Sequence, residues 1–236
     1  MADRIHYICH KVVPMRYHRL LLSLIPVIAV SCGKDDRPDR ITDADGQSYE
    51  MVRIGNDEWM ASNLRVSRFN NGDVIPLEPI DSIWGADSTE PALSFYASSD
   101  EDADMYGALY NRSVVTDPRG VCPTGLKIPS NADWDRMIAD LGGSFFAGIA
   151  LRSGENWIDP IYFGSNSSGF NAQPAGTRKD NGQYFGRGEQ TAYWSTDTNV
   201  ISGRQNVYFM GFSNPSPFQM TASKTEGFSI RCIRRP

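Results

Sequence analysis

A short apolar run that ends in a cysteine divides this chain of 236 residues into two unequal parts. From Met15 the sequence reads MRYHR, which is a basic start, and residues 20–31, LLLSLIPVIAVS, then lead to Cys32. A membrane-spanning helix needs about 20 apolar residues, whereas this run is shorter and contains Pro26. The pattern is typical of a secretory signal peptide, so we expect residues 1–31 to be removed, with Met15 as an alternative start of the chain.

The cysteine at the end of this run favours a lipid anchor. Ser31 before Cys32 and Gly33 after it resemble a bacterial lipobox, in which a diacylglycerol is joined to the thiol and the new amine is acylated. Ala29 stands where Leu is usual, which is a departure from that pattern. Two or more acyl chains hold a protein firmly at a membrane, since each buried CH₂ contributes about 0.8 kcal/mol. The alternative is a secreted protein whose Cys32 forms a disulfide.

Residues 32–41 are expected to be a lipidated tether. Lys34, Asp35 and Asp36 resemble the lysine-plus-acid signal that sends lipoproteins of the Bacteroidetes to the outer face of the outer membrane. Acidic residues and Pro38 also keep a linker extended, and this simpler interpretation is compatible with the first. We therefore predict that the protein is anchored in the outer membrane and faces the extracellular side.

Removal of the leader also removes every histidine, because His6, His10 and His18 all precede the cleavage site. Without imidazole, neither Ser-His-Asp nor Cys-His catalysis can be assembled, and His-ligated zinc or copper sites are excluded. The remaining 19 basic and 27 acidic residues give a formal net charge of −8. Lys and Arg are not clustered, so a nucleic-acid partner is not expected, and no cofactor is expected either.

Two cysteines remain after acylation, Cys122 and Cys232. An exported protein meets an oxidising compartment, so this pair is interpreted as a disulfide. Closing a loop of that length stabilises the fold by about 4 to 5 kcal/mol in the chain-entropy model. The alternative is a free nucleophilic thiol, which would lack a histidine as its base.

Residues 42–236 contain no internal repeat and no second linker, which predicts a single domain. Turn signals flank the alternating residues 47–54 and the following residues 58–64, a pattern that predicts a β-hairpin. The acidic, proline-containing residues 77–104 are interpreted as loop. Residues 105–115 then return to a strand-like pattern.

One helix is strongly signalled. Ser130 can act as its N-cap, and Asp133 stands three residues later, where the acid of a capping box belongs. Trp134 and the apolar residues after it recur at helical spacing, which predicts that this indole is core, and two glycines end the helix. A second helix is predicted over residues 145–151, and loops with short antiparallel strands from residue 154 to 235.

Six segments resemble, in order and spacing, the Fibrobacter succinogenes major paralogous domain family, over about residues 42–234. They are DADGQSYEMVRIGNDEWMASNLRVSRFNNGDVIP, YGALYNRSVV, VCPTGLKIPSNADWDRMIADLGG, SGFNAQPAGTR, YWSTD and GFSIRCIRRP. Family members are typically bacterial lipoproteins or secreted proteins of undefined role. Leu126 and Arg112 stand where the family usually has aromatic residues, so a family surface that relies on aromatics there is not expected here.

The middle and C-terminal segments are in turn similar to the formylglycine-generating enzyme group. That resemblance implies an α+β, C-type-lectin-like fold with short antiparallel strands, one or two helices and long loops. The enzyme chemistry requires redox-active cysteines that hold a metal, whereas Cys122 and Cys232 stand at the helix entrance and the last strand, where a structural bridge is expected. We therefore assign no catalytic residue.

Calcium-dependent sugar binding of the C-type-lectin kind is not supported by the sequence. Such sites need a Glu-Pro-Asn or Gln-Pro-Asp loop and a Trp-Asn-Asp strand, because calcium requires several hard oxygens. Here Gln173 and Pro174 are followed by Ala175, and Trp-Asn-Asp does not occur. Acidic groups at residues 43–45 and 100–104 could hold calcium instead, although the first lacks the spacing of an EF-hand loop and such groups are more often a turn and a solvated loop. No metal site is therefore predicted.

In the C-type-lectin-like fold, the loops between residues 156 and 198 usually form the ligand face. Our candidate ligand-binding residues there are Trp157, Tyr184, Arg178 and Asn171, and the same segment holds Tyr162, Phe185, Tyr193 and Trp194. Exposed aromatic side chains stack on glycan rings or anchor a protein partner, and the alternative is that most of them are core.

These observations together predict a surface-exposed, non-catalytic binding module for a glycan or a protein. One alternative is a structural or accessory subunit of a surface appendage or envelope complex. Another is a glycosidase that uses carboxylates alone, which needs no histidine, although no paired acids stand out in the sequence.

Overall fold

The computed structural model describes residues 39–235, except 79, 87–89, 97–101 and 159–163. The expected signal peptide, Cys32 and most of the tether lie outside the described residues. Within the described ranges, no helix is both long enough and apolar enough to cross a membrane.

The described residues form a mixed α+β fold, as expected, with five helices and eleven strands. The helices are α1 (Asp81–Ala86), α2 (Ala103–Tyr106), α3 (Arg112–Val115), α4 (Asn131–Asp140) and α5 (Ser144–Leu151). The strands are β1 (Arg40–Thr42), β2 (Ser48–Ile54), β3 (Asp57–Met60), β4 (Leu93–Ser94), β5 (Leu109–Tyr110), β6 (Ala175–Arg178), β7 (Tyr184–Arg187), β8 (Gln190–Thr198), β9 (Gln205–Gly211), β10 (Asn214–Ala222) and β11 (Ile233–Arg234).

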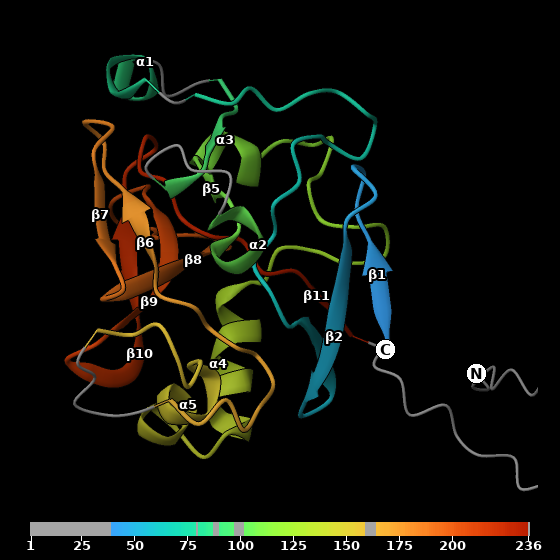
Figure 1. Ribbon diagram of the computed structural model, residues 1–236, viewed down its shortest axis with the longest axis vertical. Helices are drawn as coiled ribbons and strands as arrows, with labels where there is room; N and C mark the ends of the chain where they lie inside the picture. Colours follow the sequence, from blue (N-terminus) through green and yellow to red (C-terminus); the bar gives the residue numbers. More distant parts are fainter. Residues whose placement is uncertain (1–38, 79, 87–89, 97–101, 159–163, 236) are drawn as a thin grey trace, which may run out of the picture. The chain divides into compact units, whose positions relative to one another are not determined.

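The strands form three sheets. The first has the order β1-β2-β3-β11, the second β10-β9-β8-β6-β7, and β4 pairs with β5 in the third. The four-stranded sheet, which begins in blue, and the orange-to-red five-stranded sheet lie on opposite sides of the domain (Figure 1). The predicted hairpin is confirmed, because β2 and β3 pair antiparallel and Ile54 lies opposite Asp57 across a two-residue turn.

The strongly signalled helix is also confirmed. The Ser130 side chain accepts a hydrogen bond from the Asp133 N–H, and the Asp133 carboxylate accepts one from the Ser130 N–H, so the capping box is complete. Gly142 and Gly143, with φ of 89° and 96°, end the helix in a backbone region that glycine favours. The second helix, α5, begins and ends close to where the sequence predicts it.

The prediction for residues 105–115 is wrong over most of that segment. Only β5 is a strand there, and α3 begins two residues after it. The cause is Asn111, whose side-chain oxygen accepts a hydrogen bond from the Val114 N–H and so caps a helical turn. Residues 77–104, expected to be loop, contain the short elements α1, β4 and α2.

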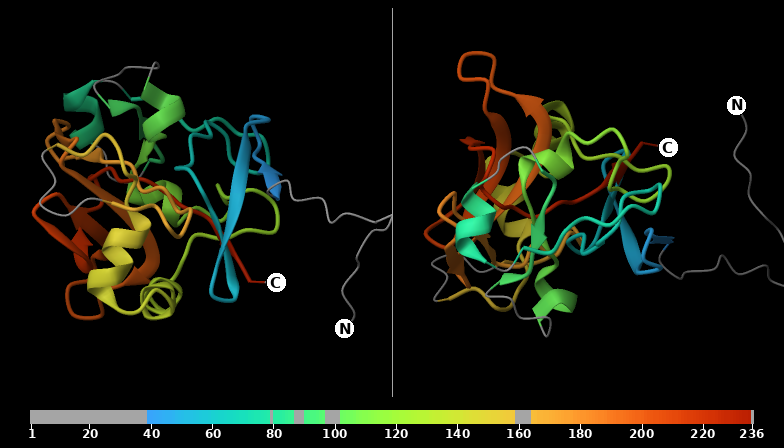
Figure 2. Two further views of the ribbon diagram at one scale, coloured as in Figure 1. Left: turned by 60° about the horizontal axis from the view of Figure 1, so that its bottom comes forward. Right: turned by 90° about the horizontal axis from the view of Figure 1, so that it is seen from above.

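The hydrophobic core consists of two clusters that pack on the two faces of the five-stranded sheet. Tyr193 and Tyr208 belong to the cluster that includes residues of α4 and α5. α5 packs against β10, as the left view of Figure 2 shows. Ala192 and Val207, which alternate with these tyrosines along β8 and β9, belong to the other cluster. The second cluster also contains the predicted disulfide between Cys122 and Cys232, which is confirmed.

Candidate functional site

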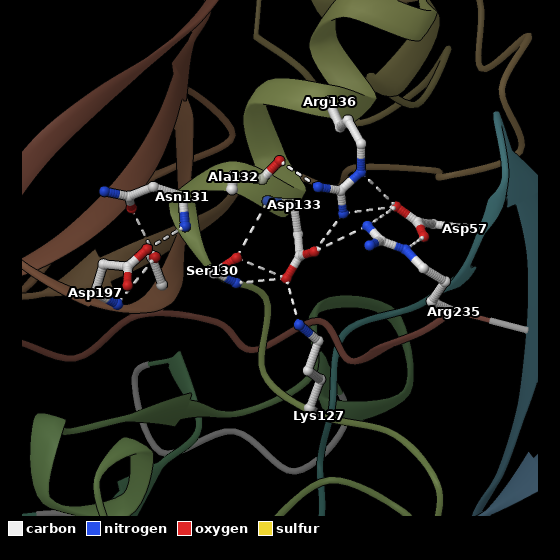
Figure 3. Close-up of polar contacts among 10 residues, drawn as sticks. Asp57, Lys127, Ser130, Asn131, Ala132, Asp133, Arg136, Asp197 and Arg235 are labelled. Atoms are coloured by element: carbon white, nitrogen blue, oxygen red, sulfur yellow. Dashed lines mark hydrogen bonds and ion pairs between the residues drawn. The ribbon is translucent and has the colours of Figure 1, made fainter.

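The densest group of charges lies at the N-terminal end of α4 (Figure 3). We call Asp57, Asp133, Lys127, Arg136 and Arg235 the charged cluster. Both carboxylates are buried, and the Lys127 Nζ lies 2.7 Å from Asp133 Oδ2. Arg136 contacts both acids, and Arg235 Nε lies 2.8 Å from Asp57 Oδ1.

Cationic side chains of the protein itself neutralise both carboxylates of the charged cluster. Burial raises the pKa of the Asp133 carboxyl, but hydrogen bonds from Lys127 and Ser130 outweigh it and hold that pKa below its usual value. The contacts join β3, α4 and the chain after β11, so we interpret the cluster as structural. Among the described residues, no group of three or more His, Cys, Asp or Glu is placed to hold a metal ion.

The first acidic group that could have held calcium forms a turn. Asp43 Oδ1 accepts hydrogen bonds from the N–H groups of Asp45 and Gln47, both at 2.9 Å. Its other oxygen accepts a hydrogen bond from the Tyr49 hydroxyl at 2.6 Å. Asp45 Oδ2 in turn accepts hydrogen bonds from the N–H and hydroxyl groups of Ser67. These carboxylates therefore order the start of the four-stranded sheet.

The second acidic group is only partly described, since residues 97–101 lie outside the described residues. Asp102 forms a two-pronged ion pair with Arg187 on β7. Asp104 forms an ion pair with Arg65. Both described acids thus serve to fasten α2 to the rest of the domain.

The predicted ligand residues fall into two separate places. Trp157 is only 8% exposed, and its indole N–H donates to Ser153 Oγ at 3.1 Å and to the Ala172 carbonyl at 3.3 Å. Asn171, with φ of 54°, lines a polar hollow of about 450 Å³ beside Glu50. Little of the Trp157 ring remains available for a ligand.

Arg178 and Tyr184 lie together elsewhere. The Arg178 guanidinium lies between the rings of Trp84, at 4.3 Å, and Tyr184, at 4.8 Å. It donates to the carbonyl oxygens of Glu78 and Gly182, and burial lowers its pKa. Tyr184 is half-buried. This arrangement fastens the loop before α1 to β6 and β7.

Two of the other aromatic residues between positions 156 and 198 belong to the core and do not face solvent. Tyr193 and Trp194 are both fully buried. Tyr162 lies outside the described residues. Phe185 is different, because 52% of it is exposed on β7.

A groove of about 290 Å³ lies on one face of the five-stranded sheet, and we call it the open groove. Its lining includes Phe209, Phe218, Met220, Gln190 and Thr177. Phe218 is 42% exposed and its ring centroid lies 5.1 Å from that of Phe209. The groove is therefore an apolar surface that is open to solvent at its outer end.

Polar groups border the open groove. Gln190 Nε2 donates to Thr177 Oγ1 at 3.3 Å. Lys179 Nζ lies 3.8 Å from Glu226 Oε1 and 5.5 Å from the centroid of the Phe185 ring. Glu226 is the single carboxylate among the described residues that line the groove, whereas a glycosidase needs two facing carboxyl groups.

The sequence analysis missed the part of this groove that β9 and β10 form. The available signal was the alternation along residues 205–211 and 218–222, which places Phe209, Phe218 and Met220 on one face of neighbouring strands. The strand pairing that joins them to β7 and β6 could not be read from that alternation.

A family model described as the Fibrobacter succinogenes major domain matches residues 52–234. No curated protein and no solved structure matches the chain.

Proposed function

The chain belongs to the Fibrobacter succinogenes major domain family, and we propose that its folded domain is a non-catalytic binding module on the bacterial surface. The observation that supports binding is the open groove, where the exposed ring of Phe218 and the half-buried ring of Phe209 line a hollow with few charges. The finer fold assignment, C-type-lectin-like, belongs to the same proposal and is supported by the resemblance of the middle and C-terminal segments.

Lipid anchoring at Cys32 is the second part of the proposal, supported by the apolar run before it and the small residues on both sides. The chain from Cys32 to the first described residue, Asp39, reaches at most about 25 Å when extended. Such a tether would hold the domain close to the outer membrane, on its extracellular side.

Anchoring is tested by labelling producing cells with a fatty-acid analogue. We expect label on the wild-type protein and none on Cys32→Ser, and mass spectrometry should find an acylated N-terminal Cys32. Protease treatment of intact cells should remove the domain. An unmodified Cys32 thiol, or a domain that stays protected in intact cells, would contradict this part of the proposal.

Binding is tested by passing envelope saccharides and envelope proteins over the immobilised protein. A ligand retained by the wild type and by Phe146→Ser, but not by Phe218→Ser, would support the groove as the site. Phe146 is the matched control, because it is 62% exposed and lies on α5. Turnover of a saccharide would instead identify an enzyme, and retention by all three proteins would exclude the groove.

A second candidate function, a structural or accessory subunit of a surface appendage or envelope complex, is favoured by the loop between β8 and β9. Val200 and Ile201 at its tip are 97% and 94% exposed. Asn199 Oδ1 accepts hydrogen bonds from the N–H groups of Ile201 and Ser202, both at 3.0 Å, so local contacts hold the tip in place. Two apolar side chains held in solvent suit insertion into another subunit.

The subunit role is tested by native mass spectrometry and cross-linking of the protein in detergent extracts of cell envelopes. Loss of a larger assembly in Val200→Asp with Ile201→Asp, but not in the control Val74→Asp, would favour this candidate. Val74 is also an exposed aliphatic residue, at a different place in the fold. An unchanged assembly in all variants would count against the candidate.

A further inference from the structure

The register of the five-stranded sheet places five side chains in one row that crosses every strand. The row runs from β7 to β10 in the order Phe185, Thr177, Ala192, Phe209 and Phe218. Directly opposite residues of an antiparallel pair point to the same face, which applies to three of the four neighbouring pairs. Thr177 lies beside Ala192 because Gly176 pairs with Thr191 in the parallel register of β6 and β8.

The five side chains of the row form a shallow channel with bulky ends and a low floor. Four strand intervals of about 4.8 Å give it a length of about 19 Å. Both ends are aromatic, with Phe185 exposed at one end and Phe218 exposed beside Phe209 at the other. The small side chains of Thr177 and Ala192 form the floor between them. A long, narrow ligand could therefore lie across the strands with flat apolar contacts near each end.

Hydrogen-bonding groups follow the same channel. The Gln190 amide lies against the Thr177 hydroxyl on the floor, and Lys179 lies beside Glu226 along one side. Lys179 and Arg204 each lie 3.8 Å from an oxygen of the Glu226 carboxylate, so these two cations are already paired with an acid. The chain as a whole carries a formal net charge of −8 without its leader. An acidic polymer would be repelled by that charge, so a neutral ligand with many hydroxyl groups fits better.

The backbone of the central strands is not available to a ligand. β9 pairs with β8 on one edge and with β10 on the other, and β8 pairs with β9 and, across its other edge, with β6 and Ser229. An extended peptide that adds a strand to a sheet relies on free backbone N–H and C=O groups, which this face does not offer. Side chains alone must therefore recognise the ligand.

We propose that the row binds a neutral glycan chain that lies across the strands. Sugar rings stack on Phe185 at one end and on the pair Phe209 and Phe218 at the other, through the C–H faces of the rings. Gln190 and the Lys179–Glu226 pair hydrogen-bond to hydroxyl groups between them. This inference rests on the proposed function, because it names the ligand class of the same open groove.

The test uses the full acylated protein in detergent and measures its affinity for neutral oligosaccharides of increasing length. Affinity should rise with length until the row is filled and then stay constant. Phe218→Ala and Phe185→Ala should each weaken binding of the longest oligosaccharide about fivefold to tenfold. Phe146→Ala should leave affinity unchanged, and Phe185→Trp should retain it, since a larger ring still stacks.

Equal urea midpoints for wild type and variants exclude unfolding as the cause of any loss. Affinity that is already maximal with one sugar ring, or that is equally lost in Phe146→Ala, would overturn the proposal. A protein ligand that depends on Phe218, with no glycan bound, would overturn the ligand class and leave the binding module intact. Absence of any ligand dependent on the groove would overturn both.

Discussion

The two faces of the five-stranded sheet use aromatic side chains in opposite ways. On the face covered by helices, the Trp134 ring stacks on Tyr208 with centroids 5.2 Å apart and an interplanar angle of 19°. On the other face, Phe209 and Phe218 approach to 5.1 Å, a similar separation. The first pair is buried, whereas the second pair is open to solvent at Phe218.

The centroid separations of the two ring pairs are thus similar, although the rings of the first pair are stacked and those of the second are tilted by 50°. The larger difference is in the elements that cover each pair. Alternation along a strand assigns neighbouring residues to opposite faces, so β8 and β9 supply both surfaces from the same residues 190–198 and 205–211. α4 and α5 cover one face of the sheet, so the side chains on that face belong to the hydrophobic core. On the other face the segment of β5 and α3 contributes to a second core cluster and leaves the groove open.

The largest expected effect is on the covered face. Replacing Trp134 with Ala removes an indole that contacts several buried rings, and should lower the free energy of unfolding by about 3 to 5 kcal/mol. Urea unfolding followed by circular dichroism measures this change. A loss of less than 1 kcal/mol would mean that the covered face is not the more stabilising one.

The second prediction concerns the segment that packs on the inner part of the groove face. Asn111 accepts hydrogen bonds from the N–H groups of Val114 and Ala92 and donates to the Glu90 carbonyl. Asn111→Ala should therefore cost about 2 to 3 kcal/mol of unfolding free energy. Hydrogen exchange should show faster exchange in β5 and α3. Unchanged exchange there would contradict the assigned role.

The third prediction concerns pH and the anchoring of α4. The pKa of Asp133 in the folded protein is below its unfolded value of about 3.9. The ionised carboxylate therefore contributes to the free energy of unfolding above that pH, and this contribution is lost as the pH falls through the folded pKa. Asp133→Asn should cost about 1 to 2 kcal/mol at pH 7. The difference from wild type should shrink between pH 5 and pH 2 as measured by urea midpoints. A constant difference would show that the ionised carboxylate is not responsible.

The smallest expected effect on stability is in the open groove. Phe218→Ser should change the free energy of unfolding by no more than about 0.5 kcal/mol, since the ring is partly solvated in the folded protein. Phe146→Ser on α5 is the matched control and should behave alike. A loss above 2 kcal/mol at Phe218 alone would show that this ring is core, and the contrast between the two faces would disappear.

Local signals in the sequence were reliable where a few neighbouring residues decide the structure. Ser130 and Asp133 predict the start of α4 because a capping box needs only their own side chains and N–H groups. The strand prediction failed after Asn111, because one side-chain cap outweighs alternation over so short a segment. The same sequence reasoning placed Trp157 among the ligand candidates, yet its ring is buried and its indole N–H donates to Ser153 and Ala172.

The sequence by itself determined the chemistry that the domain can use and the pairing of its cysteines. No histidine follows residue 18, and Cys122 and Cys232 are the two cysteines after Cys32. Only the tertiary structure decided which aromatic residues lie exposed on one face of the sheet. Phe185 and Phe218 are 33 positions apart and join one row because five strands pair in a particular register. Periodicity determines on which face of a strand a side chain lies. Strand register, and the helices or loops that cover each face, depend on contacts between residues that are distant in the sequence.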